Sequence, residues 1–102
     1  MITAEEVKHD LREIRYYYSR RNVFEEAEKS LGILPVVRTV QKYNCAIRQA
    51  PLRLCDIYTS LYIQGKTQEC VALELGYSEQ HIRRLIGELI EYLRKNFIQG
   101  GD

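Results

Sequence analysis

The polar side chains best suited to binding another molecule lie close together near the carboxyl end of the chain: Glu79, Gln80, His81, Arg83 and Arg84. They surround Ile82 and Leu85, and in a helix this spacing turns the two aliphatic side chains inward and the polar ones outward. Arginine and glutamine make paired hydrogen bonds, and arginine also carries a charge that attracts phosphate. This chemistry suits DNA recognition, because a helix with such an outer face fits the major groove.

The segment that must position these residues has the spacing of two helices joined by a tight turn. Counting from Gln68, the small residue Ala72 follows four positions on, where two helices can cross closely, and Gly76 follows after four more. Gly76 suits the left-handed conformation that ends a helix, and Ser78 can cap the first amides of the next helix. Ile82 then lies six positions beyond Gly76. The pattern predicts a helix-turn-helix followed by a long final helix.

The amino-terminal part is expected to begin with a long helix. Residues 3–6, Thr-Ala-Glu-Glu, match a capping box, so the helix is predicted to start at Thr3. Its apolar face consists of Val7, Leu11, Ile14 and Tyr18. A second cap at Asn22 leaves open whether the helix breaks near Arg20–Asn22 or continues to Lys29, and Gly32 is expected to end it.

A second helix is expected from Pro35, which suits a first helical turn, to Ala50. Its inward face is predicted to contain Val36, Val40, Tyr43 and Ile47. Pro51 opens a third helix that Gly65 ends. The inward residues of this third helix are predicted to be Leu54, Cys55, Tyr58, Leu61 and Tyr62.

Two more helices complete the predicted fold. Thr67 caps a short helix that extends to Leu75, and Ser78 caps a last helix that reaches about Asn96. No segment alternates between apolar and polar residues for long enough to form a strand. We therefore expect an all-α fold of about five helices in one compact unit. Residues 1–50 form its helical N-terminal part, residues 51–98 its helix-turn-helix part, and residues 99–102 a disordered tail.

Several stretches of the third to fifth predicted helices carry a family resemblance: Leu61-Tyr-Ile-Gln-Gly65-Lys-Thr-Gln68, Gly76-Tyr-Ser78, Ile82-Arg83, Leu89 and Leu93-Arg94-Lys95. Residues 52–97 resemble region 4 of the sigma-70 family, the part of a bacterial sigma factor that reads the −35 promoter element. The resemblance covers a little under half of the chain, and residues 1–50 do not resemble sigma regions 2 or 3. A short helical part fused to such a module is similar to small transcription regulators of phages and prophages.

The resemblance implies roles for the exposed residues at the start of the last helix. Arg84 is expected to bond guanine and Gln80 adenine, each contact discriminating by about 1–3 kcal/mol, while Arg83 binds phosphate. Glu79 lies where the family usually has a base, so it either accepts from cytosine N4 or repels DNA. Sequence specificity therefore cannot be transferred from the family.

The first motif helix is expected to contribute phosphate contacts through Thr67 and Gln68. The full set of expected DNA-binding residues is Lys66, Thr67, Gln68, Ser78, Glu79, Gln80, His81, Arg83 and Arg84. Residues 66–102 hold five Lys or Arg against six acids, and the net charge of the chain is +1. Because phosphate contacts dominate affinity for DNA, weak binding by the isolated chain is expected.

Two functions fit this sequence. The first is a sequence-specific transcription regulator that binds double-stranded DNA and contacts RNA polymerase through residues 1–50. The second is a protein-interaction module that keeps the helix-turn-helix shape and binds RNA polymerase or a sigma factor. The near-neutral charge favours the second, and the outward Gln80, Arg83 and Arg84 favour the first.

One recognition helix buries too little surface for tight specific binding, so a homodimer or help from RNA polymerase is expected. The apolar face of the first helix, from Val7 to Tyr18, either mediates self-association or is covered by the helix that begins at Pro35. We favour the second arrangement.

A run of three tyrosines, Tyr16 to Tyr18, lies on the first helix, and helical spacing allows only one or two of them to be buried. The neighbouring bases, Arg15, Arg20 and Arg21, form either a second phosphate-binding patch or a solvated surface. Three acids are near enough in sequence to neutralise them: Glu13, Glu25 and Glu26. We favour the solvated surface.

Enzymatic function is not expected, since the chain has no Gly-rich phosphate loop and no H-E-x-x-H motif. Cys45, Cys55 and Cys70 show no C-x-x-C spacing, and a zinc site would need His9 or His81 brought in from afar. Neither a metal nor a cofactor is predicted, and the cysteines are expected to be buried free thiols. No apolar run approaches a membrane span, and the N-terminus lacks the features of a signal peptide, so a cytoplasmic protein is expected.

Overall fold

The computed structural model describes residues 2–100, and it describes the side chains of residues 2–96. Within this part of the chain the fold is all-helical and contains no strand, as the sequence predicts. The elements are α1 (Ala4–Ser19), α2 (Arg21–Leu31), α3 (Pro35–Ile47), α4 (Leu52–Tyr58), a π-helical turn η1 (Thr59–Ile63), α5 (Gln68–Leu75) and α6 (Glu79–Gly100).

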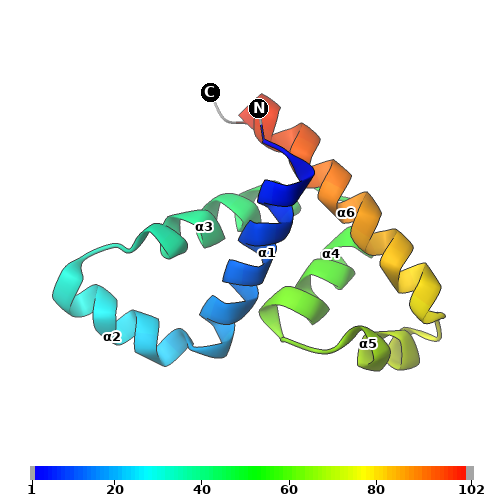
Figure 1. The fold of residues 1–102 in the computed structure, drawn as a ribbon, viewed down its shortest axis with the longest axis horizontal. Coiled ribbons are helices and arrows are strands. Elements are labelled where there is room, and N and C mark those ends of the chain that lie inside the picture. The colour runs from blue at the N-terminus through cyan, green and yellow to red at the C-terminus, as the bar shows by residue number, and fades with distance from the viewer. Residues whose placement is uncertain (1, 101–102) are drawn as a thin grey trace.

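Helix α1 crosses the middle of the molecule, with α2 and α3 on one side and α4, α5 and α6 on the other (Figure 1). It packs against η1, α3 and α6, so that the amino-terminal helix contacts both halves of the chain. The long helix α6 packs in turn on α4, α5, α1 and α3. The two segments that the sequence distinguishes, before and after residue 50, therefore share one packed structure.

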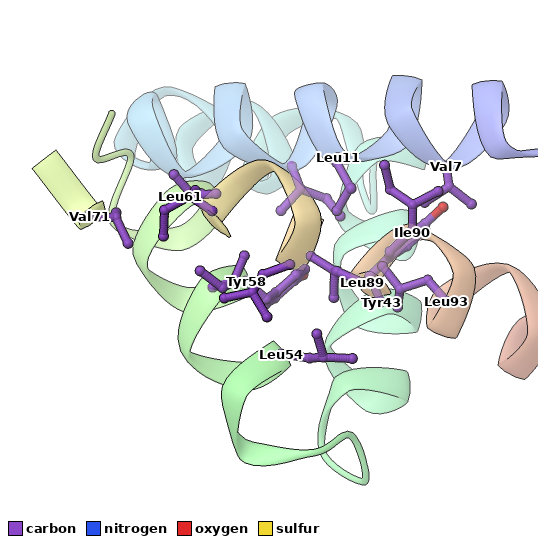
Figure 2. Packing of buried hydrophobic residues seen from close by; sticks show 14 of the residues in the cluster. Val7, Leu11, Tyr43, Leu54, Tyr58, Leu61, Val71, Leu89, Ile90 and Leu93 are labelled. Atoms are coloured by element: carbon purple, nitrogen blue, oxygen red, sulfur yellow. The ribbon is translucent and has the colours of Figure 1, made fainter. Parts of the chain in front are cut away.

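The core lies where α1, α3, α4 and α6 meet. Figure 2 shows Val7 and Leu11 of α1 pointing toward Leu89 and Leu93 of α6, with Tyr58 beside them. These side chains belong to one continuous cluster of buried apolar residues that also takes in η1 and α5. Burial of such side chains supplies the main favourable contribution to folding, at about 1.5–3 kcal/mol for each large residue.

The amino-terminal boundaries follow the predicted signals. The Glu6 amide donates to Thr3 Oγ1 at 3.2 Å, so Thr3 caps α1 as expected. The helix then breaks at Arg20, which settles the alternative that the sequence leaves open. Gly32 ends α2 with a φ of 86°, a conformation that favours glycine. Helix α2 itself contains no buried residue, and it is held to α1 by Phe24, whose ring lies 5.4 Å from that of Tyr17.

Two hydrogen-bonded groups of tyrosines connect α1, α3 and α4 inside the protein. The Tyr43 hydroxyl donates to Asp10 Oδ2 at 2.6 Å. The Tyr58 hydroxyl donates to Asn44 Oδ1 at 2.7 Å, and Asn44 Nδ2 donates to the Tyr18 hydroxyl at 3.0 Å. Among the residues whose side chains the structure describes, each buried side-chain nitrogen or oxygen has a hydrogen-bond partner, which avoids the cost of burying it unpaired.

The turn η1 was not predicted. The sequence indicates one continuous helix up to Gly65, but the Gln64 amide donates to the Thr59 carbonyl oxygen five residues back, at 2.8 Å. Lys66 reaches still further back, because its amide donates to the Ser60 carbonyl oxygen at 3.0 Å. The π-helical turn therefore ends the helical segment that begins with α4 and leads the chain into the loop before α5.

Several sequence predictions about buried faces are wrong. Val37 is buried and Val36 only partly so, because α3 presents Val37, Val40 and Tyr43 to the core. On α1 the buried tyrosine is Tyr17, while Tyr18 is half-buried. The favoured arrangement of the α1 face is confirmed, because α3, the helix that begins at Pro35, covers it together with η1 and α6.

The cysteine prediction is also wrong in part. All three thiols are free, but Cys45 and Cys70 are exposed and only Cys55 is partly buried. The Cys55 thiol donates to the Ile47 carbonyl oxygen at 3.1 Å, which fixes it beside the loop between α3 and α4. At the carboxyl end, α6 continues past Asn96 to Gly100. The predicted disordered tail over residues 99–102 thus begins inside α6, and residues 101 and 102 lie outside the described residues.

Candidate nucleic-acid interface

The candidate interface is built from α5, α6 and the three residues between them, 76–78. Helix α5 begins at a cap, since the Cys70 amide donates to Thr67 Oγ1 at 3.1 Å. It ends at Gly76, which has the left-handed conformation expected of it (φ 71°, ψ 29°). The Tyr77 amide closes the end of the helix by donating to the Ala72 carbonyl oxygen at 2.9 Å.

Helix α6 starts with a second cap, because the His81 amide donates to Ser78 Oγ at 3.1 Å. Ile82 and Leu85 are buried, as is Ala72 on α5, so the two helices pack through these small and aliphatic residues. The expected binding residues exposed at the start of α6 are Glu79, Gln80, Arg83 and Arg84. The inward and outward faces of α6 are therefore those that the sequence predicts, except that His81, expected to face outward, is half-buried.

The remaining expected site residues have different surroundings. Thr67 and Gln68 are exposed at the start of α5, and Ser78 is exposed at the start of α6. The Thr67 and Ser78 hydroxyls accept backbone hydrogen bonds as caps, which leaves each O–H able to donate to a phosphate oxygen. His81 is half-buried, and its ring packs edge-on against that of Tyr77, with 4.6 Å between centroids. That contact holds His81 against the turn, away from the most exposed face of α6.

Lys66 differs most from the expectation, because its charge is already paired. Its Nζ lies 2.9 Å from Glu74 Oε2, and Glu74 Oε1 accepts from the Cys70 thiol at 3.2 Å. The hydrogen bond from Lys66, followed by that from Cys70, lowers the pKa of the Glu74 carboxyl below its ordinary 4.5. The same contacts to Glu74 raise the pKa of Lys66 and of the Cys70 thiol. Lys66 uses one of its three donors on Glu74, whose negative charge offsets the attraction of Lys66 for a phosphate.

The charges of this unit cancel. Residues 66–84 contain three bases, Lys66, Arg83 and Arg84, and three acids, Glu69, Glu74 and Glu79. Arg83 and Arg84 form no ion pair with any residue that the structure describes, so both guanidinium groups are available to a ligand. Glu69 and Glu79 each lie in the first turn of a helix, where they interact favourably with the helix dipole and offset the two arginines.

Three large apolar side chains that are exposed on α5 and in the turn were not predicted from the sequence. Leu73, Leu75 and Tyr77 are all exposed, and Leu73 retains 79% of its accessible surface. The signal for this exposure was present in the sequence, since Ala72 and Val71 occupy the inward positions of α5 and leave Leu73 facing out. An exposed group of this kind on a small protein is typical of a binding surface.

The described part of the chain offers no sign of a metal centre or a membrane span. No group of three or more His, Cys, Asp or Glu side chains in it is arranged to hold a metal ion. None of its helices combines the length and the apolar character that crossing a bilayer requires. Comparison of the chain with models of protein families, with curated proteins and with solved structures finds no match.

Proposed function

We propose that this protein is a non-enzymatic, sequence-specific DNA-binding regulator of transcription that acts in the cytoplasm and reads duplex DNA with the start of α6. The observation that supports the proposal best is the outward face of α6. There Gln80, Arg83 and Arg84 are exposed and the two arginines are unpaired within the described residues, while Ile82 and Leu85 hold the helix on α5. An unpaired guanidinium on a rigid helix is well suited to guanine and to phosphate.

The supporting geometry extends to the turn and to α5. Caps at Thr67 and Ser78 and the left-handed Gly76 define both helix starts and the turn between them. The caps and the turn are also part of the resemblance to sigma region 4. We therefore include in this proposal a relationship to sigma region 4 and to the small regulators of phages and prophages. In this account Arg84 and Gln80 read bases, and Arg83, Thr67 and Gln68 bind phosphates.

A second candidate function rests on the exposed apolar side chains of Leu73, Leu75 and Tyr77. Together with the zero net charge of residues 66–84, they favour a module that binds protein, such as a subunit of RNA polymerase or a sigma factor. The two functions are compatible if these apolar side chains contact polymerase while α6 contacts DNA. A homodimer is a further way to increase the area of DNA contact.

The experiment that tests the proposal is a selection of genomic duplex fragments with the purified full-length chain, at low and moderate salt, with and without core RNA polymerase. An enriched motif with the protein alone supports autonomous DNA reading. A motif that needs polymerase supports an accessory role resembling that of a sigma factor. No enrichment in either case contradicts the proposal and leaves the protein-binding module.

A further inference from the structure

Helix α1 carries a stripe of bases on the side that contacts Gly65, in the loop before α5. Arg12, Arg15 and Ser19 follow one another at helical spacing, with Tyr16 beside them. With Gly65 these side chains line an open hollow of about 420 Å³ on the protein surface. Arg20 adds a further guanidinium group, which lies 5.8 Å from the centroid of the Tyr16 ring. The hollow is therefore bordered by positive charge.

This stripe adjoins the candidate interface. Arg15 Nη2 donates to the Gly65 carbonyl oxygen at 3.0 Å, across 50 residues of sequence. Gly65 has a φ of 70°, and the chain from it leads through Lys66 to Thr67, the cap of α5. Figure 1 shows the carboxyl end of α1 beside the loop that enters α5. The arginines of α1 thus lie next to the amino-terminal end of the first motif helix.

The acids that the sequence offers as neutralising partners form no ion pair with Arg12, Arg15 or Arg20 in the described part of the chain. Glu13 Oε1 lies 3.4 Å from His9 Nε2 and contacts no guanidinium group, and Glu26 pairs with Lys29 at 3.7 Å. Glu25 pairs with Arg21 at 2.9 Å, so the charge of Arg21 is compensated by an ion pair. Arg12, Arg15 and Arg20 form no ion pair with any side chain that the structure describes. Of the three arginines considered in the sequence, all are exposed to solvent as expected, but only Arg21 is paired with one of the three acids, so the expected neutralisation is wrong for Arg15 and Arg20.

We propose that Arg12, Arg15 and Arg20 form a second contact for the phosphodiester backbone of the same DNA duplex that α6 reads, an inference that rests on the proposed function. Residues 66–84 carry no net charge, so they supply little of the phosphate attraction that dominates affinity for DNA. The three unpaired guanidinium groups of α1 supply it. Their position next to the start of α5 extends the phosphate contacts of Thr67 and Gln68 along the flanking backbone.

The test compares two double variants of the full chain that remove the same charge. Arg12→Gln with Arg15→Gln removes two bases of the stripe. Arg38→Gln with Arg48→Gln removes two exposed bases of α3 and the residue that follows it, neither of which forms an ion pair in the described part of the chain. Binding to a fluorescent duplex of random sequence is measured by anisotropy over a series of salt concentrations.

The expected result is a stripe variant that binds roughly tenfold more weakly at low salt, with a salt slope reduced by about 0.9 for each phosphate that the variant no longer binds. The double variant of Arg38 and Arg48 is expected to keep most of the wild-type affinity at low salt and most of the wild-type salt slope. Because Arg15 also bonds Gly65, Arg12→Gln alone serves as a second variant: Arg12 makes no hydrogen bond within the described residues, and its replacement is expected to lower the slope by about 0.9.

Equal behaviour of the stripe and matched variants, with wild-type protein bound to the duplex, overturns the inference and leaves the proposed function standing. Failure of the wild-type chain to bind any duplex, with or without core RNA polymerase, contradicts the proposed function and the inference together. Loss of binding to core polymerase alone identifies the stripe as a protein contact and also overturns the inference.

Discussion

Lys66 and Glu74 form an ion pair across α5, with 2.9 Å between Lys66 Nζ and Glu74 Oε2. The pair joins the loop before the helix to the last turn of the same helix, and the Cys70 thiol completes it through Glu74 Oε1. In the free protein it offsets one of the three positive charges of residues 66–84. A phosphate bound at the start of α5 therefore shares Lys66 with Glu74, whose negative charge opposes its binding.

Replacing Glu74 by glutamine is expected to strengthen binding to DNA of any sequence. The change frees Lys66 for phosphate, so the affinity for a random-sequence duplex rises a few-fold and the salt slope grows by about 0.9, as for one more bound phosphate. Anisotropy measured over a salt series reports both quantities. Glu26→Gln is the matched control, because Glu26 pairs with Lys29 on α2, far from the interface. An equal gain in the control would mean that total charge, and not Lys66, is responsible.

The buried tyrosines predict how stability falls at alkaline pH. Burial raises the pKa of Tyr43 and Tyr58 above the ordinary value of 10.0, and for Tyr43 the hydrogen bond to Asp10 raises it further. Because the folded protein holds these protons more tightly than the unfolded chain, their contribution is complete below pH 10 and declines as pH rises above it. Urea unfolding at several pH values is expected to show this decline.

The Tyr43→Phe variant tests whether the buried Tyr43 hydroxyl contributes to this decline. The variant loses the hydrogen bond to Asp10, at a cost of about 1–2 kcal/mol near neutral pH, and its stability declines less steeply above pH 10. Tyr77→Phe is the control, since the Tyr77 ring is exposed at the turn. The assignment fails if the decline above pH 10 has the same slope in both variants.

Leu11→Ala is expected to destabilise the whole chain in one cooperative transition. Leu11 is 1% exposed and points from α1 toward Leu89 of α6 (Figure 2), so truncating its side chain costs about 2–5 kcal/mol. Circular dichroism and tyrosine fluorescence during urea unfolding should give one midpoint. Leu73→Ala, at a side chain that is almost fully exposed, should change stability by less than about 0.5 kcal/mol. Two separate transitions would show that residues 1–50 and the remainder unfold independently.

Alanine substitutions at two glycines are expected to have opposite effects. Gly76 has a φ of +71°, where a Cβ is strained, so Gly76→Ala should cost about 1–2 kcal/mol. Gly87 lies inside α6 with open space around it, so Gly87→Ala should stabilise the protein by about 0.5–1 kcal/mol. Thermal unfolding of both variants measures the difference. A stabilised Gly76→Ala protein would contradict the left-handed turn between the two helices.

Much of the fold follows from local signals in the sequence. The caps at Thr3, Thr67 and Ser78 and the turns at Gly32 and Gly76 each depend on a side chain or φ value that a few neighbouring residues determine. Such signals locate helix starts and stops, and the helical period then identifies the inward residues. The exposed face of α6 was predicted for the same reason.

The features that escaped prediction depend on contacts between distant residues or on small differences in backbone geometry. The bond from Arg15 to Gly65 spans 50 residues, and nothing in either local sequence indicates it. The pairing of Lys66 with Glu74 depends on how the chain leaves η1, and the side-chain spacing of a π-helical turn is too close to that of an α-helix to be recognised from sequence. Cys70 is exposed because α5 buries Val71 and Ala72 instead.

The central claim is that the start of α6 reads DNA, and its most direct test is selection of genomic duplex fragments with the wild-type chain and two single variants. Arg84→Ala is expected to relax the preferred motif at one position, with a loss of about 1–3 kcal/mol in discrimination. Arg83→Ala is expected to weaken binding to all fragments and to lower the salt slope by about 1, with the motif unchanged. Equal, salt-insensitive behaviour of the two variants, or no enriched motif with the wild-type chain even in the presence of core RNA polymerase, would contradict the claim.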